Sequence, residues 1–178
     1  FTKNNFMNIL MNMSSRLVIA LGIAGCVITA GCDLSAGRMI GFGACISGML
    51  LQRMDYSGKF FPDMQPLNVF VVALIAMLVC AAFGTVTGFF IAYLNVPPFI
   101  ATLAMMEIVY GIGLIVTNAT PLGGYVEQYT NVSNGKFLGI NYLIWIAIIV
   151  AAITWFIFNM TRHGKYMYAI GGNPQAAE

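Results

Sequence analysis

The sequence predicts an all-α fold: a polytopic helical bundle of an integral membrane protein with four to five membrane segments. Hydrophobic residues make up 60% of the chain and charged residues only 8%, whereas charged residues are about a quarter of an ordinary soluble domain. The lengths of several apolar runs are close to the minimum of about 20 residues that a helix needs to cross a bilayer. Polar stretches rich in Pro, Gly and Asn separate these runs. Together these features indicate a bundle of membrane helices.

The first two segments are predicted at residues 16–32 and 39–52. The second segment is short and rich in glycine, so we expect it to be short or broken. The linker at 33–38 is polar, and a polar break at membrane depth is tolerated only where it faces protein or water. The two segments therefore form either two spans or one broken, re-entrant pair.

The other three segments are longer and better bounded. The third is predicted at 67–94, which is long enough to tilt in the bilayer. Residues 95–98 end it, because proline lacks the amide donor that a helix interior needs. The fourth is predicted at 99–117. After a polar loop at 118–141, the fifth is predicted at 142–160, with aromatic residues near both edges, as is frequent at membrane interfaces.

Glycines four residues apart recur in these segments. Gly37 and Gly41 form one pair, and Gly84 and Gly88 form another. Small residues let helix backbones approach closely in lipid. We expect these pairs to pack within the bundle, and contact with a second copy of the chain is the alternative.

Several classes of function lack support in the sequence. The net charge of +2 and the absence of a dense Lys/Arg block argue against nucleic-acid binding. The sequence has no P-loop motif and no set of residues typical of a catalytic site. The four cysteines lack the spacing of metal ligands. We therefore predict no catalytic and no metal-binding residue, although a membrane enzyme or scaffold stays an alternative reading.

The residues that remain suit the passage of a polar solute. Asp33 and Ser35 lie at the polar break, and Glu107 lies in mid-span, where a carboxylate costs several kcal/mol unless it is paired, hydrated or protonated. We expect Glu107 to face the protein interior or a hydrated cavity. The candidate pathway residues are Asp33, Ser35, Pro98, Phe99, Thr102 and Glu107.

Each candidate also has a purely structural reading. Asp33 could cap a helix or form an ion pair with Arg38. Glu107 could be a satisfied carboxylate that faces the bundle interior. Pro98 and Thr102 could merely mark where one helix ends and the next begins.

The tail at 161–178 is predicted to lie in the cytoplasm, because Arg162, His163 and Lys165 directly follow the last span. Charges elsewhere do not distinguish the two sides. Asn173 is a favoured N-cap and Pro174 a favoured first helical residue, so a short helix is expected to begin there. The two preceding glycines would supply a tight turn. Such a helix could dock on a soluble partner, or it could be a plain amphipathic connector.

Three stretches resemble motifs of the bacterial ABC sugar permeases of the ribose/galactose group. Residues 31–37 are similar to the family pattern G-x-D-L-S-x-G, and residues 96–103 are similar to P-P-F-I-x-T-L. Residues 164–177 resemble G-x-x-x-x-A-I-G-G-N-x-x-A-A. The three occur in the family's order. Within the family the chain looks closest to the galactose/methyl-galactoside branch, a likeness supported by residues 16–22, 33–38, 50–55 and 92–96.

The resemblance implies a permease subunit of an ATP-driven importer in the bacterial cytoplasmic (inner) membrane. Its substrate would be a monosaccharide, either galactose or methyl-galactoside or a similar sugar. The implied partners are a cytoplasmic ATP-binding subunit, a periplasmic sugar-binding protein and a second permease copy. No cofactor is expected in this chain, because ATP would bind the partner subunit.

Family members continue into further spans, so residues 1–178 are expected to be a single transmembrane permease domain, the N-terminal part of a longer chain. Glu107 departs from the family pattern, which has an apolar residue there, so the resemblance gives it no sugar-binding role. An ion-coupled secondary transporter, with Glu107 or Asp33 as the coupling carboxylate, stays an alternative. The residues implied to dock on the ATP-binding subunit are Gly171, Gly172, Asn173, Pro174, Ala176, Ala177 and Glu178.

Overall fold

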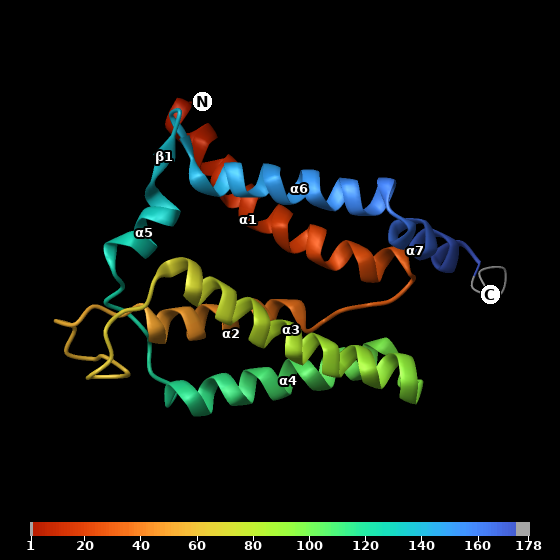
Figure 1. Ribbon diagram of the computed structural model, residues 1–178, viewed down its shortest axis with the longest axis horizontal. Helices are drawn as coiled ribbons and strands as arrows, with labels where there is room; N and C mark the ends of the chain where they lie inside the picture. Colours follow the sequence, from red (N-terminus) through yellow and green to blue (C-terminus); the bar gives the residue numbers. More distant parts are fainter. Residues whose placement is uncertain (1, 174–178) are drawn as a thin grey trace. The chain divides into compact units, whose positions relative to one another are not determined.

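The computed structural model, which describes residues 2–173, is dominated by helices (Figure 1). The described residues of Phe1–Cys32 and Val132–Glu178 form one compact unit, and Asp33–Asn131 form a second. The prediction of a single permease domain stays a prediction. The elements are α1 (Lys3–Ile28), α2 (Ala36–Leu50), α3 (Val69–Leu94), α4 (Pro98–Thr117), α5 (Glu127–Asn134), β1 (Lys136–Phe137), β2 (Ile140–Asn141), α6 (Tyr142–Met160) and α7 (Arg162–Gly172).

Within the unit Asp33–Asn131, α2, α3 and α4 pack against one another. Large apolar side chains from all three helices form its core, and Phe42 meets Phe83 edge-on with ring centroids 5.6 Å apart. Close packing of this kind is what fixes helices against one another once lipid covers their outer faces. The buried residues of this core are Phe42, Ile46, Ala76, Met105 and Val109.

The boundaries of α3 and α4 follow from local chemistry. The side chain of Asn68 caps α3 by accepting a hydrogen bond from the Phe70 amide at 2.9 Å. At the other end Asn95 adopts a left-handed conformation with φ 53°, which asparagine tolerates better than most residues. Helix α4 then begins at Pro98, because a first helical residue needs no amide donor. The predicted segments 67–94 and 99–117 therefore differ from the structure by two residues or fewer.

Gln52 holds the loop after α2 in place. Its side chain is only 1% exposed. Its Nε2 donates to the Gly123 carbonyl oxygen at 3.1 Å, and its Oε1 accepts from the Phe60 amide at 2.7 Å. One buried side chain thus satisfies partly buried backbone groups from two separate loops.

Replacing Gln52 with leucine is expected to destabilise the unit by about 1–3 kcal/mol, because the two backbone groups lose their partners in a buried place. The measurement is the thermal unfolding midpoint of the full-length permease in detergent. Gln65→Leu is the matched control, because Gln65 is exposed and exposed substitutions usually change stability by less than about 0.5 kcal/mol. Equal midpoints for the two variants would contradict this role for Gln52.

In the other unit, α1 lies along α6, and α7 packs against both (Figure 1). Helix α1 begins at Lys3, before the membrane segment predicted to start at residue 16. No proline or glycine interrupts residues 3–15, so the polar N-terminal turns continue the same helix. The helix ends at Ile28 instead of 32, because Ala30 is left-handed with φ 57° and the Gly31 amide donates back to the Cys26 carbonyl oxygen at 2.8 Å.

The second segment is short, as predicted: α2 has 15 residues. Among the described residues, four other helices are long and apolar enough to cross a membrane, namely Asn5–Ile28, Val69–Leu94, Pro98–Thr117 and Tyr142–Met160. The polar loop predicted at 118–141 contains the short helix α5 and the two-residue antiparallel pair β1–β2. These additions leave the all-α architecture unchanged.

Among the described residues, neither glycine pair packs closely against another helix, contrary to the prediction. A Cβ added at Gly37, Gly41, Gly84 or Gly88 would meet no atom within 4 Å. The spacing places each pair on one helix face, but spacing does not determine which face the neighbouring helices cover.

Candidate functional site

The polar break before α2 is a local hydrogen-bonded turn. The Asp33 carboxylate accepts from the Ser35 amide at 2.9 Å and from the Ser35 hydroxyl at 2.6 Å. Ser35 is buried and Asp33 half-buried. The N-cap residue of α2 is Ser35, and no side chain makes a capping hydrogen bond there. The first structural reading of Asp33, a helix cap, is therefore wrong, and Asp33 instead forms a local turn just before the helix. The second is wrong, because the ion pair of the described residues joins Arg53 to Asp55 and not Asp33 to Arg38.

The candidates at the start of α4 point in different directions. Phe99 is 57% exposed, whereas Thr102 is 3% exposed on the packed side of the helix. The Thr102 hydroxyl donates to the Pro98 carbonyl oxygen at 2.8 Å. Thr102 thus bonds back to a carbonyl of its own helix, and the place of Thr102 and Pro98 in the pathway stays a prediction.

Glu107 lies on the exposed face of α4. The packed stripe of this helix includes Met105 and Val109. Glu107 is two residues from each, which is roughly 200° around the helix at about 100° per residue. Glu107 therefore takes no part in the core formed by the described residues, and the prediction that it faces the protein interior or a hydrated cavity stays a prediction.

Glu107→Gln is expected to reduce transport by the full-length permease without reducing its amount in the membrane. The side chain contributes no core packing, and neutralising a mid-span carboxylate removes an insertion cost of several kcal/mol. Uptake should be compared with the amount of inserted protein. Equal loss of both quantities would contradict a role in the pathway and favour a structural one.

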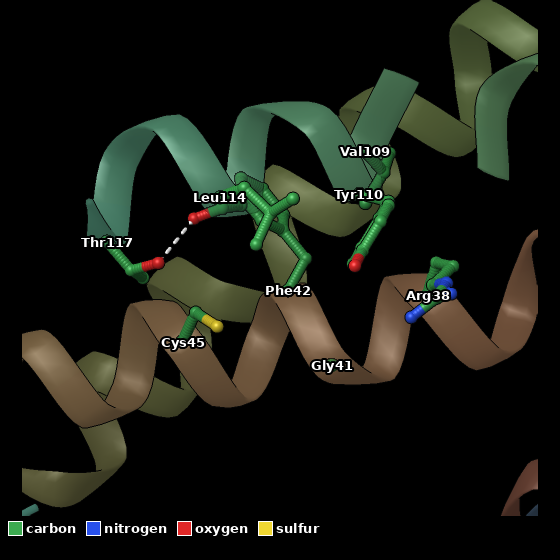
Figure 2. Close-up of a pocket in the computed structure, with 9 residues that line it drawn as sticks. Arg38, Gly41, Phe42, Cys45, Val109, Tyr110, Leu114 and Thr117 are labelled. Atoms are coloured by element: carbon green, nitrogen blue, oxygen red, sulfur yellow. Dashed lines mark hydrogen bonds between the residues drawn. The ribbon is translucent and has the colours of Figure 1, made fainter. Parts of the chain in front are cut away.

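A pocket of about 230 Å³ lies between α2 and α4 (Figure 2). The Arg38 guanidinium carbon lies 4.0 Å from the centroid of the Tyr110 ring, a cation–π arrangement. Figure 2 shows the Tyr110 hydroxyl directed from α4 toward α2, between Arg38 and Phe42. At the far end the Thr117 hydroxyl donates to the Gly113 carbonyl oxygen at 2.8 Å. Apolar atoms form most of the rest of the pocket wall.

Sequence reasoning missed this pocket because it treated Arg38 as a charge in a loop. The structure includes Arg38 in the first turn of α2. The spacing from Arg38 to Phe42 and Cys45, three or four residues apart on one helix face, is a signal that could have indicated its role. Tyr110, the partner of Arg38 in this pocket, is on a different helix that only packing brings close.

The corner between α6 and α7 is capped and tight. The Thr161 hydroxyl accepts from the Gly164 amide at 3.3 Å and donates to the Ile157 carbonyl oxygen at 2.6 Å. A Cβ at Gly164 would lie 2.0 Å from the Phe158 carbonyl oxygen. Only glycine fits this position, so the corner sets the direction of α7.

The far end of α7 packs against the end of α1. A Cβ at Gly171 would lie 1.8 Å from the Ile28 carbonyl oxygen. One turn earlier the Met167 side chain reaches Gly25, where an added Cβ would lie 2.8 Å from the Met167 Cε. Helix α7 is thus fixed at both ends.

These contacts correct the predicted turn. Gly171 and Gly172 belong to the last turn of α7, so they do not form a tight turn. Neither has a positive φ. Asn173 is the C-cap of α7, with its amide donating to the Ala169 carbonyl oxygen at 3.0 Å. Pro174, Gln175, Ala176, Ala177 and Glu178 lie outside the described residues, so the helix predicted there stays a prediction.

No group of His, Cys, Asp or Glu in residues 2–173 is arranged to hold a metal ion. Apolar helices of spanning length, a mostly apolar pocket between the short α2 and the spanning-length α4, and an exposed basic helix after Met160 are typical of a membrane transport component. The chain belongs to the family described as the permease component of the branched-chain amino acid transport system, which matches residues 5–178. It is therefore a multi-pass membrane permease, a class of transport protein and not of enzyme.

Individual relatives refine this placement. The chain is 43% identical to the galactose/methyl galactoside import permease of Escherichia coli (strain K12) and 44% identical to that of Haemophilus influenzae, over 98% of this chain and 54% of each relative. It is 32% identical to the ribose import permease of E. coli (strain K12), over 99% of this chain and 52% of the relative. The chain spans about half the length of the curated relatives it matches. No solved structure matches it.

Proposed function

We propose that this chain forms part of the membrane-spanning permease of an ATP-driven monosaccharide importer, with galactose, methyl-galactoside or a similar sugar as the substrate. The observation that carries the proposal is the 43% identity to a galactose/methyl galactoside import permease over 98% of the chain. The lower identity of 32% to a ribose import permease favours the galactose type over the ribose type.

The proposed division of labour places energy and capture in other proteins. A cytoplasmic ATP-binding subunit would hydrolyse ATP, and a periplasmic sugar-binding protein would deliver the sugar to the permease in the bacterial cytoplasmic membrane. This chain would bind no cofactor. The exposed Arg162, His163 and Lys165 on α7 support a cytoplasmic position for that helix.

Helix α7 is the proposed coupling element, together with Asn173 and the residues that follow it. A force on a helix that packs tightly on two membrane helices moves them with it, because packed interfaces respond as rigid bodies. The close approach of Gly171 to Ile28 supplies one of these contacts. The coupling residues would thus act on α1 as well as on α6.

A second permease copy completes the proposed assembly. The open surface beside Gly84 and Gly88 on α3 supports it, because a partner helix could approach closely there. The size of a purified full-length permease in detergent, measured by light scattering, tests this point. A monomer would contradict it.

The test of function uses the full-length permease with its ATP-binding and sugar-binding partners in proteoliposomes. We expect uptake of radiolabelled galactose that requires ATP and continues when an uncoupler abolishes ion gradients. Uptake that stops with the uncoupler but continues without ATP would identify an ion-coupled transporter instead. Uptake of ribose in preference to galactose would overturn the substrate assignment.

A further inference from the structure

Arg38, in the first turn of α2, places its guanidinium carbon 4.0 Å from the centroid of the Tyr110 ring of the spanning-length helix α4. Its partner Tyr110 lies in α4, a helix of 20 residues, seven residues before Thr117. At about 1.5 Å per residue, the ring is roughly 10 Å inside that end of a helix about 30 Å long. A charged side chain at such depth is rare and marks a functional site by default.

The charge of Arg38 has no acidic partner among residues 2–173, whose ion pair joins Arg53 to Asp55. The cation–π contact with Tyr110 uses no N–H hydrogen bond, so the donors of the guanidinium stay available. The Tyr110 hydroxyl also makes no hydrogen bond with the described residues. Both groups line the pocket. The pocket therefore presents several donors and a hydroxyl to whatever occupies it.

The pocket has the size and surface for one sugar ring. Its volume of about 230 Å³ is below the about 300–1,000 Å³ of pockets that hold drug-sized ligands. The guanidinium edge can donate to two neighbouring hydroxyls at once, and Tyr110 can serve a third. The apolar wall at Val109 and Leu114 suits the C–H face of a pyranose. A phosphate group would use the same guanidinium, but the pocket offers no second cation.

We propose that the Arg38–Tyr110 pocket is a binding subsite for a neutral monosaccharide, an inference that rests on the proposed sugar-import function. Arg38 holds two hydroxyls, Tyr110 positions the guanidinium and contacts a third hydroxyl, and Cys45 lies beside the bound ring on α2. A lipid headgroup could present a sugar or a phosphate to the same donors, so the test separates free sugar from lipid.

Cys45 provides the readout, because its thiol lines the pocket. The full-length permease is prepared with Cys45 as its sole cysteine, in nanodiscs of phosphatidylcholine, and its labelling rate with methyl methanethiosulfonate is measured with and without galactose. Bound ligand should slow labelling by 1 + [L]/Kd, about elevenfold at ten times Kd. A sole-cysteine protein with Cys80, on α3 and outside this pocket, is the matched control and should show no protection.

Two substitutions locate the interaction. Arg38→Gln removes charge-assisted hydrogen bonds and should weaken protection roughly tenfold or more. Arg38→Lys keeps the charge but loses the planar fork, so it should also weaken protection. Unchanged labelling of Cys80 in each background establishes that the fold is retained. Full protection in the Arg38→Gln protein would overturn the proposal.

Parallel uptake assays separate this proposal from the proposed function. ATP-driven galactose uptake by the Cys45 protein without galactose protection of Cys45 would overturn the subsite and leave the function standing. Failure to transport any sugar would overturn both. Protection that requires phosphatidylglycerol and ignores galactose would overturn the subsite in favour of a lipid site. A Cys45 thiol that never reacts, or equal protection of Cys80, would also overturn it.

Discussion

Gly171→Ala is expected to release the end of α7 from α1, although alanine is the better helix former. An added Cβ would lie 1.8 Å from the Ile28 carbonyl oxygen, and real Cβ contacts essentially never fall below 3.0 Å. Relief requires a backbone shift, and overpacking of this kind costs about 1–3 kcal/mol. Helix propensity alone predicts the opposite sign, a gain of about 1 kcal/mol over glycine. The direction of the effect therefore separates the two causes.

Hydrogen–deuterium exchange of α7 in the full-length permease measures this release, because undocked helices exchange faster. Gly172→Ala is the matched control: it makes the same chemical change one residue later, where a Cβ would meet no atom within 4 Å. Only the Gly171 variant should exchange faster. In the assembled importer the same variant should lose ATP-driven uptake while its level in the membrane is kept. Identical exchange in the two variants would show that the contact with Ile28 is unimportant.

Gly164→Ala is expected to have an effect of similar size, because here too the clash is entirely with backbone and three backbone atoms lie within 2.6 Å of the added Cβ. The added Cβ would lie 2.0 Å from the Phe158 carbonyl oxygen and 2.6 Å from its Cα. No side chain can rotate away to relieve it. The α6–α7 corner must therefore open, and α7 loses the direction that brings its far end to α1. We expect a loss of about 1–3 kcal/mol or more in stability.

The measurement is the thermal midpoint together with exchange across α7. Lys165→Ala is the neighbouring control, because Lys165 is exposed and such changes usually stay within about 0.5 kcal/mol. Retention of slow exchange across α7 in the Gly164 variant would contradict the role of this corner. Gly172→Val should also leave α7 docked on α1, because a Cβ at this position would meet no atom within 4 Å. A tight turn at Gly172 would not tolerate valine, so this variant separates the two structures.

The membrane helices were predictable because hydropathy is a property of composition along the chain. Residues 142–160 were predicted as a span, and α6 has those bounds, with Asn141 capping it through the Leu143 amide at 2.8 Å. The short α2 was equally visible as a short apolar run. The start of α1 was not visible in the hydropathy, because its first turns are polar. These turns are helical because no proline or glycine interrupts them.

The candidate site was predicted less well than the fold. Asp33 and Ser35 do meet, since residues two apart in a turn interact through local geometry. Glu107 lies on the exposed face of α4 and Thr102 on its packed face, because the positions of α2 and α3 determine which face of α4 is covered. The pairing of Arg38 with Tyr110 joins residues 72 positions apart, and no local pattern links them.

Composition and apolar run length thus determine that this chain is a membrane protein, roughly where its long apolar helices lie and, through its motifs, which family it resembles. Packing between helices determines that Gly171 lies against backbone, that Glu107 is exposed and that Arg38 contacts the ring of Tyr110. Gly171 and Gly172 are indistinguishable as letters, yet one lies against a backbone carbonyl of α1 and the other faces open space. The reason is physical: hydropathy adds along the chain, whereas steric contact depends on distances between atoms that are far apart in sequence.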